Sequence, residues 1–225
     1  MKTIIVTGAG TGLGKELSLL FSQKEYHIVL AGRHSKKLAG VRTEIEQAGG
    51  SASELVLDVR NHDDIKEKML VLNKSFDLYG LINNAGIGVF GPFTESRDKD
   101  IEDGFSTNVY GPMFMTKALL PYLELKGEGL ILNIISTAGL RGKKNEAVYC
   151  AGKFALRGLT ESLQKEYEGT GIQFVAAYMG GMNTPFWEGS SHVENPESFR
   201  SPHEVAEIIL SQLDQKEIII ESKKR

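Results

Sequence analysis

Cysteine is almost absent from this sequence, since Cys150 is the only one among 225 residues. A single thiol excludes an internal disulfide and a zinc site built from several thiolates, and it is typical of a reducing compartment. There is no basic excess either, because 26 basic residues face 29 acidic ones and leave a net charge of −3. Neither nucleic acid nor an anionic membrane is therefore expected as a main partner.

Long hydrophobic runs are also missing. No stretch approaches the roughly 18 consecutive apolar residues of a membrane-spanning helix, and the apolar start at Ile4-Ile5-Val6 meets glycines too soon for a secretory signal. We expect a cytoplasmic protein without a membrane partner. Apolar residues make up 41% of the chain and charged residues 24%, which is ordinary globular usage, so residues 1–225 are expected to form a single domain with a buried core.

Two common catalytic motifs do not occur. The G-x-S-x-G turn that carries the nucleophile of α/β hydrolases is missing, which disfavours hydrolysis. The five histidines are scattered, and Glu207 stands where a metalloprotease helix beginning at His203 would need its second histidine. No metal site is therefore expected.

What the chain does contain is an alternation of short aliphatic runs with stretches of helical period. The runs are continuously apolar, which is typical of a sheet covered on both faces. Between them apolar residues recur at helical spacing, as at Leu13, Leu17 and Leu20, and Asn61 and Ser201 carry the signals of helix N-caps. The pattern predicts an α/β fold, a doubly wound, Rossmann-type three-layer sandwich with a parallel sheet of about seven strands. The expected strands are residues 4–6, 27–31, 54–57, 81–82, 130–135, 173–178 and 217–220.

A glycine-rich turn connects the first expected strand to the first expected helix. Free amides at a helix N-terminus can bind a phosphate there. The common G-x-G-x-x-G fingerprint and the phosphate-binding loop of nucleotide triphosphatases both fail to fit. The pattern that fits is T-G-x-x-x-G-x-G on Thr7, Gly8, Gly12 and Gly14, a wider turn whose glycines let a pyrophosphate approach the backbone. A glycine turn without a ligand is the alternative interpretation.

Tyr149 and Lys153 stand four residues apart at the start of an expected helix and share one of its faces. A nearby ammonium favours the phenolate and lowers a tyrosine pKa by about one to three units, so the two side chains are a candidate acid/base pair. Alternatively, they begin a solvated polar stripe that continues through Arg157 and Glu161.

Other polar residues favour the acid/base interpretation. Ser136 follows the apolar run 130–135, and Asn84-Ala85-Gly86 follows residues 81–82. Both sites fall at the carboxyl edge of the predicted sheet, where doubly wound folds bind ligands. Asn108 stands within an otherwise apolar helical stretch, where an amide has no structural reason to be.

Taken in chain order, the TGxxxGxG, NNAG, Asn108, Ser136 and YxxxK elements resemble those of the short-chain dehydrogenase/reductase family, in its form of about 250 residues. The resemblance covers nearly the whole chain. It implies that Tyr149 exchanges a proton with the substrate oxygen and that Ser136 polarises the carbonyl. It further implies that Lys153 holds the nicotinamide ribose and lowers the tyrosine pKa, and that Asn108 carries a water linking Lys153 to solvent.

The end of the second expected strand indicates which cofactor binds. A 2′-hydroxyl is usually recognised by a carboxylate at that point, whereas a 2′-phosphate needs a cation. The chain has no carboxylate there, and Arg33 with Ser35 suits a phosphate. NADP(H) is therefore expected ahead of NAD(H), with an ordinary basic loop as the alternative. The resemblance adds Asp58 as an adenine contact. The expected cofactor-binding residues are Gly8, Gly10, Thr11, Gly12, Leu13, Gly14, Arg33, His34, Asp58, Val59, Asn84, Ala85, Gly86, Tyr149, Lys153, Gly180 and Thr184.

Two departures from the family pattern stand out. Met179 replaces the usual proline before Gly180, which predicts a looser backbone around Thr184. The sequence after the last expected strand is short, so dimer and tetramer both remain open, although the resemblance implies a homo-oligomer. Cys150 is expected to be a small residue on a buried helix face.

The expected function is reduction of a ketone or aldehyde by NADPH, with alcohol oxidation as the reverse reaction. A 3-oxoacyl-thioester reductase and a non-catalytic NADP(H)-binding redox sensor are the alternatives. The irregular stretch 186–200 is short, which favours a small or open-ended small-molecule substrate. Large apolar residues flank the motifs and predict an apolar pocket; they are Phe90, Phe93, Leu140, Met182, Phe186 and Trp187.

Overall fold

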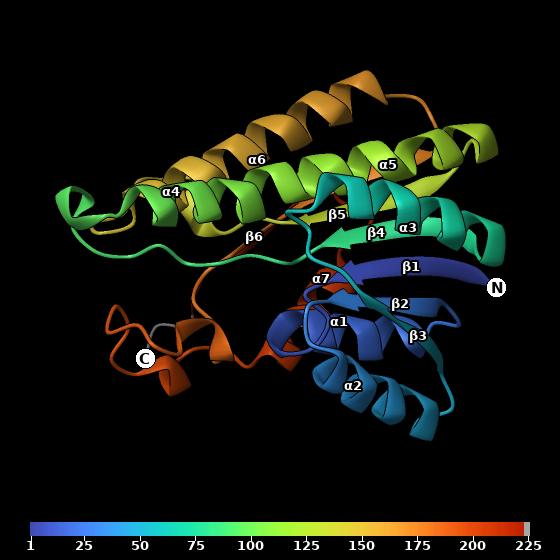
Figure 1. The fold of residues 1–225 in the computed structure, drawn as a ribbon, viewed down its shortest axis with the longest axis horizontal. Helices are drawn as coiled ribbons and strands as arrows, with labels where there is room; N and C mark the ends of the chain where they lie inside the picture. The colour runs from blue at the N-terminus through green and yellow to red at the C-terminus, as the bar shows by residue number, and fades with distance from the viewer. Residues whose placement is uncertain (223–225) are drawn as a thin grey trace.

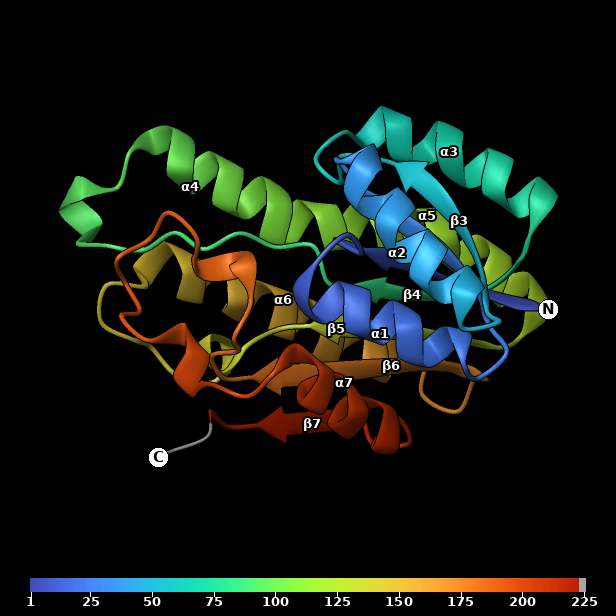
Figure 2. The same ribbon diagram turned by 90° about the horizontal axis from the view of Figure 1, so that it is seen from below.

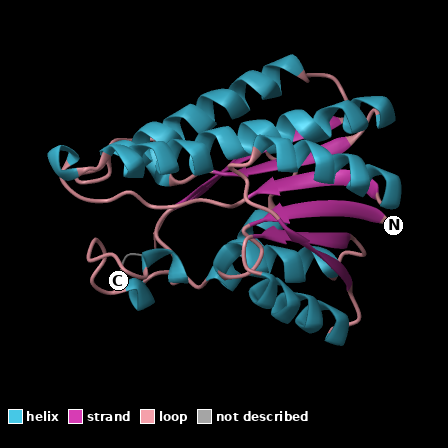
Figure 3. Cartoon of the chain, in the orientation of Figure 1, coloured by secondary structure: helices cyan, strands magenta, loops and turns pink. Residues whose placement is uncertain are grey.

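A computed structural model describes residues 1–222 of the chain, and its centre is a parallel sheet of seven strands in the order β3-β2-β1-β4-β5-β6-β7. Helices cover both faces of this sheet (Figures 1 and 3), which confirms the doubly wound α/β fold that the sequence predicts. The strands are β1 (Lys2–Thr7), β2 (His27–Gly32), β3 (Ser51–Val56), β4 (Asp77–Asn83), β5 (Gly129–Ile134), β6 (Ile172–Met179) and β7 (Glu217–Ile220).

The helices divide into two layers. Helices α3, α4, α5 and α6 lie on one side of the sheet, and α1, α2 and α7 lie on the other (Figures 1 and 2). Alternate residues of a buried strand serve the two cores: Ile4 and Val6 pack on the α1 side, whereas Ile5 packs on the α3 side. The helices are α1 (Gly12–Ser22), α2 (Ser35–Gln47), α3 (His62–Ser75), α4 (Asp98–Phe105), α5 (Gly111–Lys126), α6 (Ala147–Glu166) and α7 (Pro202–Ser211).

Two predicted helix starts are confirmed by their hydrogen bonds. Asn61 Oδ1 accepts from the Asp64 amide at 3.1 Å, and Ser201 Oγ accepts from the Glu204 amide at 3.1 Å. Each cap satisfies an amide that the first helical turn leaves without a partner.

The third strand differs from its prediction. It begins at Ser51, three residues earlier than expected, and ends at Val56, so Asp58 lies beyond the strand rather than closing it. The reason is that β3 is the outermost strand on its side of the sheet and is only half-buried. An edge strand needs no continuous apolar run, and its polar first half therefore carries no strand signal.

The sheet's topology creates a crevice between β1 and β4. Strand order reverses there, because β1 continues toward β2 and β3 on one side and β4 toward β7 on the other. Ligands of doubly wound folds bind outside the carboxyl ends of the strands at such a point. Among the described residues, no helix is long and apolar enough to cross a membrane.

Candidate active site

The predicted glycine turn lies at the crevice. Its geometry requires glycine at three positions, for two different reasons. Gly8 and Gly12 have φ angles of +66° and +55°, in the left-handed region that favours glycine. A Cβ on Gly14 would lie 2.4 Å from the Gly8 carbonyl oxygen and 2.5 Å from Asn84 Nδ2. The first turn of α1 can therefore approach the loop only because Gly14 has no side chain.

Hydrogen bonds between β1 and β4 hold this turn in place. Thr7 Oγ1 accepts from the amides of Asn84 and Ala85, both at 3.0 Å. Asn84 Nδ2 in return donates to the carbonyl oxygens of Thr7 at 2.9 Å and Gly8 at 3.3 Å. The side chain of Asn84 thus positions the glycine turn, a role that its sequence motif does not reveal.

Ser136, Tyr149 and Lys153 meet at the carboxyl end of β5. Ser136 follows β5 and caps the short 3₁₀ turn η3 (Thr137–Gly139), where its Oγ accepts from the Ala138 amide at 3.1 Å. Tyr149 and Lys153 lie in the first two turns of α6, with Lys153 Nζ 5.6 Å from the centre of the Tyr149 ring. Lys153 Nζ donates to the Ile134 carbonyl oxygen at 3.0 Å. All three side chains are buried.

Burial dominates the protonation of this group. It raises the pKa of the Tyr149 phenol, although a hydrogen bond with Ser136 acts in the opposite direction and the nearby Glu146 carboxylate adds to the rise. Burial lowers the pKa of the Lys153 ammonium to about 8. In the protein alone Tyr149 is therefore a neutral phenol at neutral pH, which is the form that donates a proton. The lowering of its pKa by Lys153, implied by the family resemblance, stays a prediction.

Asn108 lies in a π-helical turn, η2 (Ser106–Tyr110), between α4 and α5. Its Oδ1 accepts from the Ile87 amide and its Nδ2 donates to the Ile87 carbonyl oxygen, both at 2.9 Å. A Cβ on Gly86 would meet Asn108 Oδ1 at 3.1 Å and Lys153 Nζ at 3.8 Å. Asn108 thus holds the chain after β4 beside Lys153, so the expectation that its amide has no structural reason to be there is wrong. That Asn108 also carries a water linking Lys153 to solvent, as the family resemblance implies, stays a prediction. Single π turns inside helices often occur at functional sites.

A cavity of about 560 Å³ joins these elements. Every predicted cofactor-binding or catalytic residue lines it except Gly14 and Asn108, which lie behind the lining. Backbone amides of the glycine turn, the N-terminus of α1 and the cations Arg33 and Lys37 are on one side, and Tyr149 and Lys153 are on the other. This arrangement fits a phosphate-bearing dinucleotide, because the glycine turn leaves room for a pyrophosphate at a helix N-terminus.

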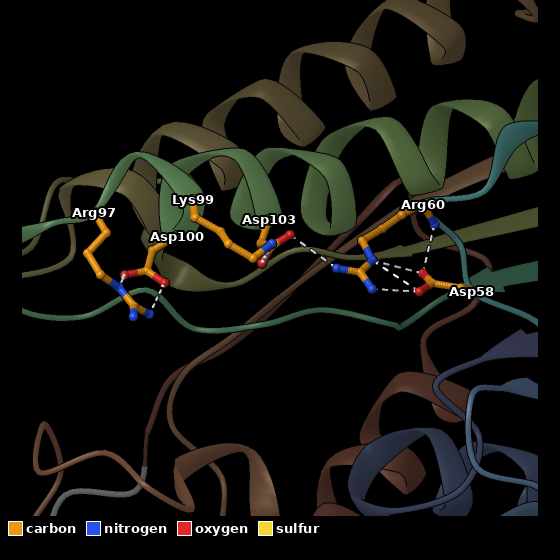
Figure 4. A network of polar contacts seen from close by, with 6 residues as sticks. All are labelled: Asp58, Arg60, Arg97, Lys99, Asp100 and Asp103. Carbon is orange, nitrogen blue, oxygen red and sulfur yellow. Dashed lines mark hydrogen bonds and ion pairs between the residues drawn. The ribbon is translucent and has the colours of Figure 1, made fainter.

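Sequence reasoning missed several polar residues of the cavity wall. Arg60 binds both oxygens of Asp58, at 2.7–3.1 Å, and reaches Asp103 on α4 at 3.1 Å (Figure 4). Hydrogen bonding to Arg60 holds the pKa of the Asp58 carboxyl below its usual range. Further lining residues not predicted are Lys143, Glu146 and Glu188. The contacts of Arg60 with Asp103 and of Glu146 with His192 join segments 43 and 46 residues apart, so no local spacing indicates them.

The predicted apolar pocket is present in part. Phe186 and Trp187 belong to the 3₁₀ turn η4 (Pro185–Trp187) and line the cavity with Met182, and Phe90 packs against Phe186 and Trp187. The prediction for Phe93 is wrong, because its side chain is 64% exposed. Leu140 packs with another core cluster, since the η3 turn directs it under α6.

The backbone directly after β6, where Met179 stands in place of the family's usual proline, is held by two hydrogen bonds, and the looser backbone predicted around Thr184 stays a prediction. The Gly180 amide donates to the Ile220 carbonyl oxygen and the Gly181 amide to Ser222 Oγ, both at 2.8 Å. These bonds connect the backbone after β6 to the end of β7. Cys150 is buried as predicted.

Comparison with known proteins agrees with this geometry. The short chain dehydrogenase family profile matches residues 2–195. A ketoacyl reductase of Nostoc sp., HetN, is 30% identical over 227 residues, which cover 97% of this chain and 78% of that protein. A sepiapterin reductase of Chlorobaculum tepidum is 27% identical over 195 residues, or 82% of this chain and 79% of that one.

Two solved structures share the fold. One is a variant of actinorhodin polyketide ketoreductase with NADPH, with a TM-score of 0.89, 26% identity, and coverage of 97% of this chain and 95% of that chain. The other is an alcohol dehydrogenase from the archaeon Thermococcus sibiricus complexed with 5-hydroxy-NADP, with a TM-score of 0.87, 25% identity and the same coverage. At 225 residues the chain is shorter than the form of about 250 residues that its motifs resemble.

Proposed function

The chain belongs to the short-chain dehydrogenase family of oxidoreductases, and we propose that within this family it is an NADPH-dependent reductase of ketones or aldehydes. The observation that carries the proposal is the convergence of Ser136, Tyr149 and Lys153, all buried, on the cavity that also contains the glycine turn. We include in the proposal that residues 1–225 act as one NAD(P)-binding domain.

The reaction joins a hydride and a proton to a carbonyl group. A nicotinamide cofactor, held by the glycine turn and Lys153, would supply the hydride chemistry when bound. Tyr149 holds the proton at Oη and transfers it to the carbonyl oxygen as the carbon–oxygen double bond is reduced to an alcohol. Ser136 Oγ donates a hydrogen bond to the same oxygen and stabilises the negative charge that develops there. The raised pKa of Tyr149 favours the protonated phenol that this direction of reaction needs.

Lys153 assists without touching the carbonyl oxygen. Its ammonium is buried beside the tyrosine and fixed by the Ile134 carbonyl oxygen. A positive charge at this position stabilises the phenolate that forms when Tyr149 gives up its proton. Its remaining donors are available for the hydroxyls of the cofactor's ribose, as the family resemblance implies.

NADPH is proposed ahead of NADH because cations line the cavity beyond β2. Arg33, His34 and Lys37 line it there, and no carboxylate follows directly on β2 to accept from a 2′-hydroxyl. After Arg60, whose hydrogen bond is the main cause, the charge of Arg33 also helps to lower the pKa of the Asp58 carboxyl, in keeping with a position beside this wall of the cavity. The two solved relatives described above hold NADPH and an NADP derivative.

A 3-oxoacyl thioester is the second candidate substrate. The observation in its favour is the 30% identity with a ketoacyl reductase over 97% of the chain. Such a substrate carries its ketone on a long arm, and apolar side chains that could contact this arm, Met182, Phe186 and Trp187, line the cavity. The substrate panel below therefore includes both classes.

The test is NADPH oxidation, followed at 340 nm, with a panel of ketones, aldehydes and 3-oxoacyl thioesters. Tyr149→Phe should lower kcat by about a hundredfold to ten-thousandfold, the usual contribution of general acid catalysis, and should still bind NADPH. Tyr110→Phe is the matched control, because Tyr110 is 49% exposed outside the site. Cofactor binding with no turnover on any substrate would favour the redox sensor instead.

A further inference from the structure

A second feature of the site concerns the segment between β6 and α7, residues 185–199, which we call the cover segment. It lies beyond the carboxyl ends of the strands (orange in Figure 1). Its turn η4 places the Phe186 ring 5.9 Å from the Tyr149 ring, and Trp187 stacks on Phe90 at 5.4 Å. Phe90, on the chain after β4, lies 5.6 Å from Tyr149. The cover segment thus forms an aromatic wall beside the proposed proton donor.

A polar contact ties the cover segment to the helix that carries Tyr149. His192 Nε2 lies 2.9 Å from Glu146 Oε1. Glu146 directly precedes α6, three residues before Tyr149, and its side chain is only 10% exposed. The His192 ring also stacks on Phe90, with centroids 4.4 Å apart and planes at 4°. The imidazole therefore bridges a buried carboxylate and the aromatic wall.

The contact is well placed to hold the segment. Glu146 is nearly buried, and a hydrogen bond between buried groups is stronger than one in water. A lysine also lies near the carboxylate, but the Lys143 Nζ is 4.0 Å away and its side chain is 30% exposed, so it replaces the imidazole poorly. If the segment moved away, Glu146 would lose its closest partner, and a buried carboxylate without a partner is costly.

We propose that Glu146 and His192 form a latch that closes the cover segment over the substrate side of the cavity. Both are positioning residues, which act by placing Phe186 and Trp187 beside Tyr149. The consequence for substrates rests on the proposed function, whereas closure of the segment does not. Opening the latch should weaken substrate binding and leave the cofactor's phosphate contacts, on the other side of the cavity, unchanged.

The fluorescence of a tryptophan in the cover segment can test this proposal. Trp187 is the chain's only tryptophan and belongs to the cover segment, so fluorescence reports the segment alone. His192→Phe keeps an aromatic ring against Phe90 but removes the bond to Glu146. We expect the acrylamide quenching constant of Trp187 to rise about twofold or more, as for a locally opened segment. His192→Gln, which restores an N–H donor, should bring quenching back toward the original value.

The matched control is the pair of His203 on α7 and Glu16 on α1. It has the same 2.9 Å separation but lies outside the cavity lining, with His203 55% exposed. His203→Phe should leave Trp187 quenching unchanged. Glu146→Leu breaks the latch from the other side and should raise quenching as His192→Phe does. The double variant should add little to either single change, because both remove one contact.

Kinetics test the consequence for substrate. On the substrate that gives turnover, His192→Phe should raise KM about fivefold or more, with kcat and the Kd for NADPH within about twofold. Unchanged quenching in both His192→Phe and Glu146→Leu would overturn the latch, whatever the activity. If no substrate is turned over by the unaltered protein, the proposed function fails, while the fluorescence result still decides whether the latch exists.

Discussion

At the scale of single residues, Lys153 has a measurable effect on stability. The residue is 4% exposed, and burial lowers the pKa of its ammonium to about 8. Between about pH 8 and the pKa near 10.4 of a lysine in an unfolded chain, the unfolded state binds more protons than the folded state. Stability rises with pH wherever this is so. The lysine that serves the proposed reaction is therefore most destabilising at low and neutral pH.

We expect the free energy of unfolding to rise by about 2 kcal/mol between pH 7 and pH 9.5 relative to Lys153→Met, which has no group to titrate. The comparison with this variant removes the contributions of other groups. Urea unfolding at several pH values measures it. Parallel pH curves for the two proteins would show that Lys153 keeps an ordinary pKa in the folded chain.

A second residue-scale prediction concerns Arg33, which we expect to favour binding of NADPH over NADH. The fork of its guanidinium suits a phosphate, and hydrogen bonds to charged groups contribute about 1.5–3 kcal/mol. Arg33→Ala should therefore raise the Kd for NADPH about tenfold to a hundredfold and leave that for NADH within about twofold. Titration calorimetry measures both.

Arg97→Ala is the control for this substitution, because Arg97 is an exposed arginine that pairs with Asp100 on α4 (Figure 4) and does not line the cavity. If Arg33→Ala lost equal affinity for NADPH and NADH, Arg33 would position the loop after β2 and would not bind the 2′-phosphate.

At the scale of elements, α1 depends on close contact with the turn that precedes it. Gly14→Ala would drive a Cβ into the Gly8 carbonyl oxygen, a backbone atom that cannot move without opening the turn. We expect loss of NADPH binding and destabilisation by more than about 1–3 kcal/mol, the usual cost of overpacking. Titration of the cofactor and urea unfolding check the two effects.

Gly40→Ala is the opposite case and the natural comparison. Gly40 lies in α2, and a Cβ there would meet nothing within 4 Å. Alanine should stabilise the protein by about 0.5–1 kcal/mol, because it loses less conformational freedom in a helix. NADPH affinity should not change. If Gly14→Ala and Gly40→Ala lost NADPH affinity to a similar extent, the contact between Gly14 and the Gly8 carbonyl oxygen would not be the cause of the loss.

At the scale of the whole molecule, the helical layer of α4, α5 and α6 has exposed aromatic side chains. Tyr110 is 49% exposed and Phe154 43%. The family resemblance implies that α5 and α6 pair between subunits, and we predict a homodimer through this layer. Exposed apolar residues that pack against a partner are a common feature of such interfaces.

Phe154→Lys should convert the dimer to a monomer, since it would place two charges in the interface. Light scattering after gel filtration measures the mass directly. Val71→Lys, on α3, is the matched control because Val71 is 63% exposed and lies on another helix. A molecular mass that stays the same in Phe154→Lys would exclude this face as the interface.

The sequence by itself determined the layers of the fold and the motif-bearing part of the site. Apolar runs, helical spacing and each short motif, such as the glycine turn and the Tyr149–Lys153 pair, are set within a few residues. Their order along the chain carries the family resemblance, and the structure brings Ser136, Tyr149 and Lys153 together at one cavity. Such features can be read locally, because backbone geometry fixes which neighbours share a face.

Only the tertiary structure decided the contacts across the chain. Asn84 supports the glycine turn from 76 residues away, and Glu146 meets His192 across 46 residues. The early start of β3 depends on its position at the sheet edge. These features follow from how the elements pack, and no spacing encodes them, because residues far apart in sequence become neighbours only when the sheet and its helices are assembled.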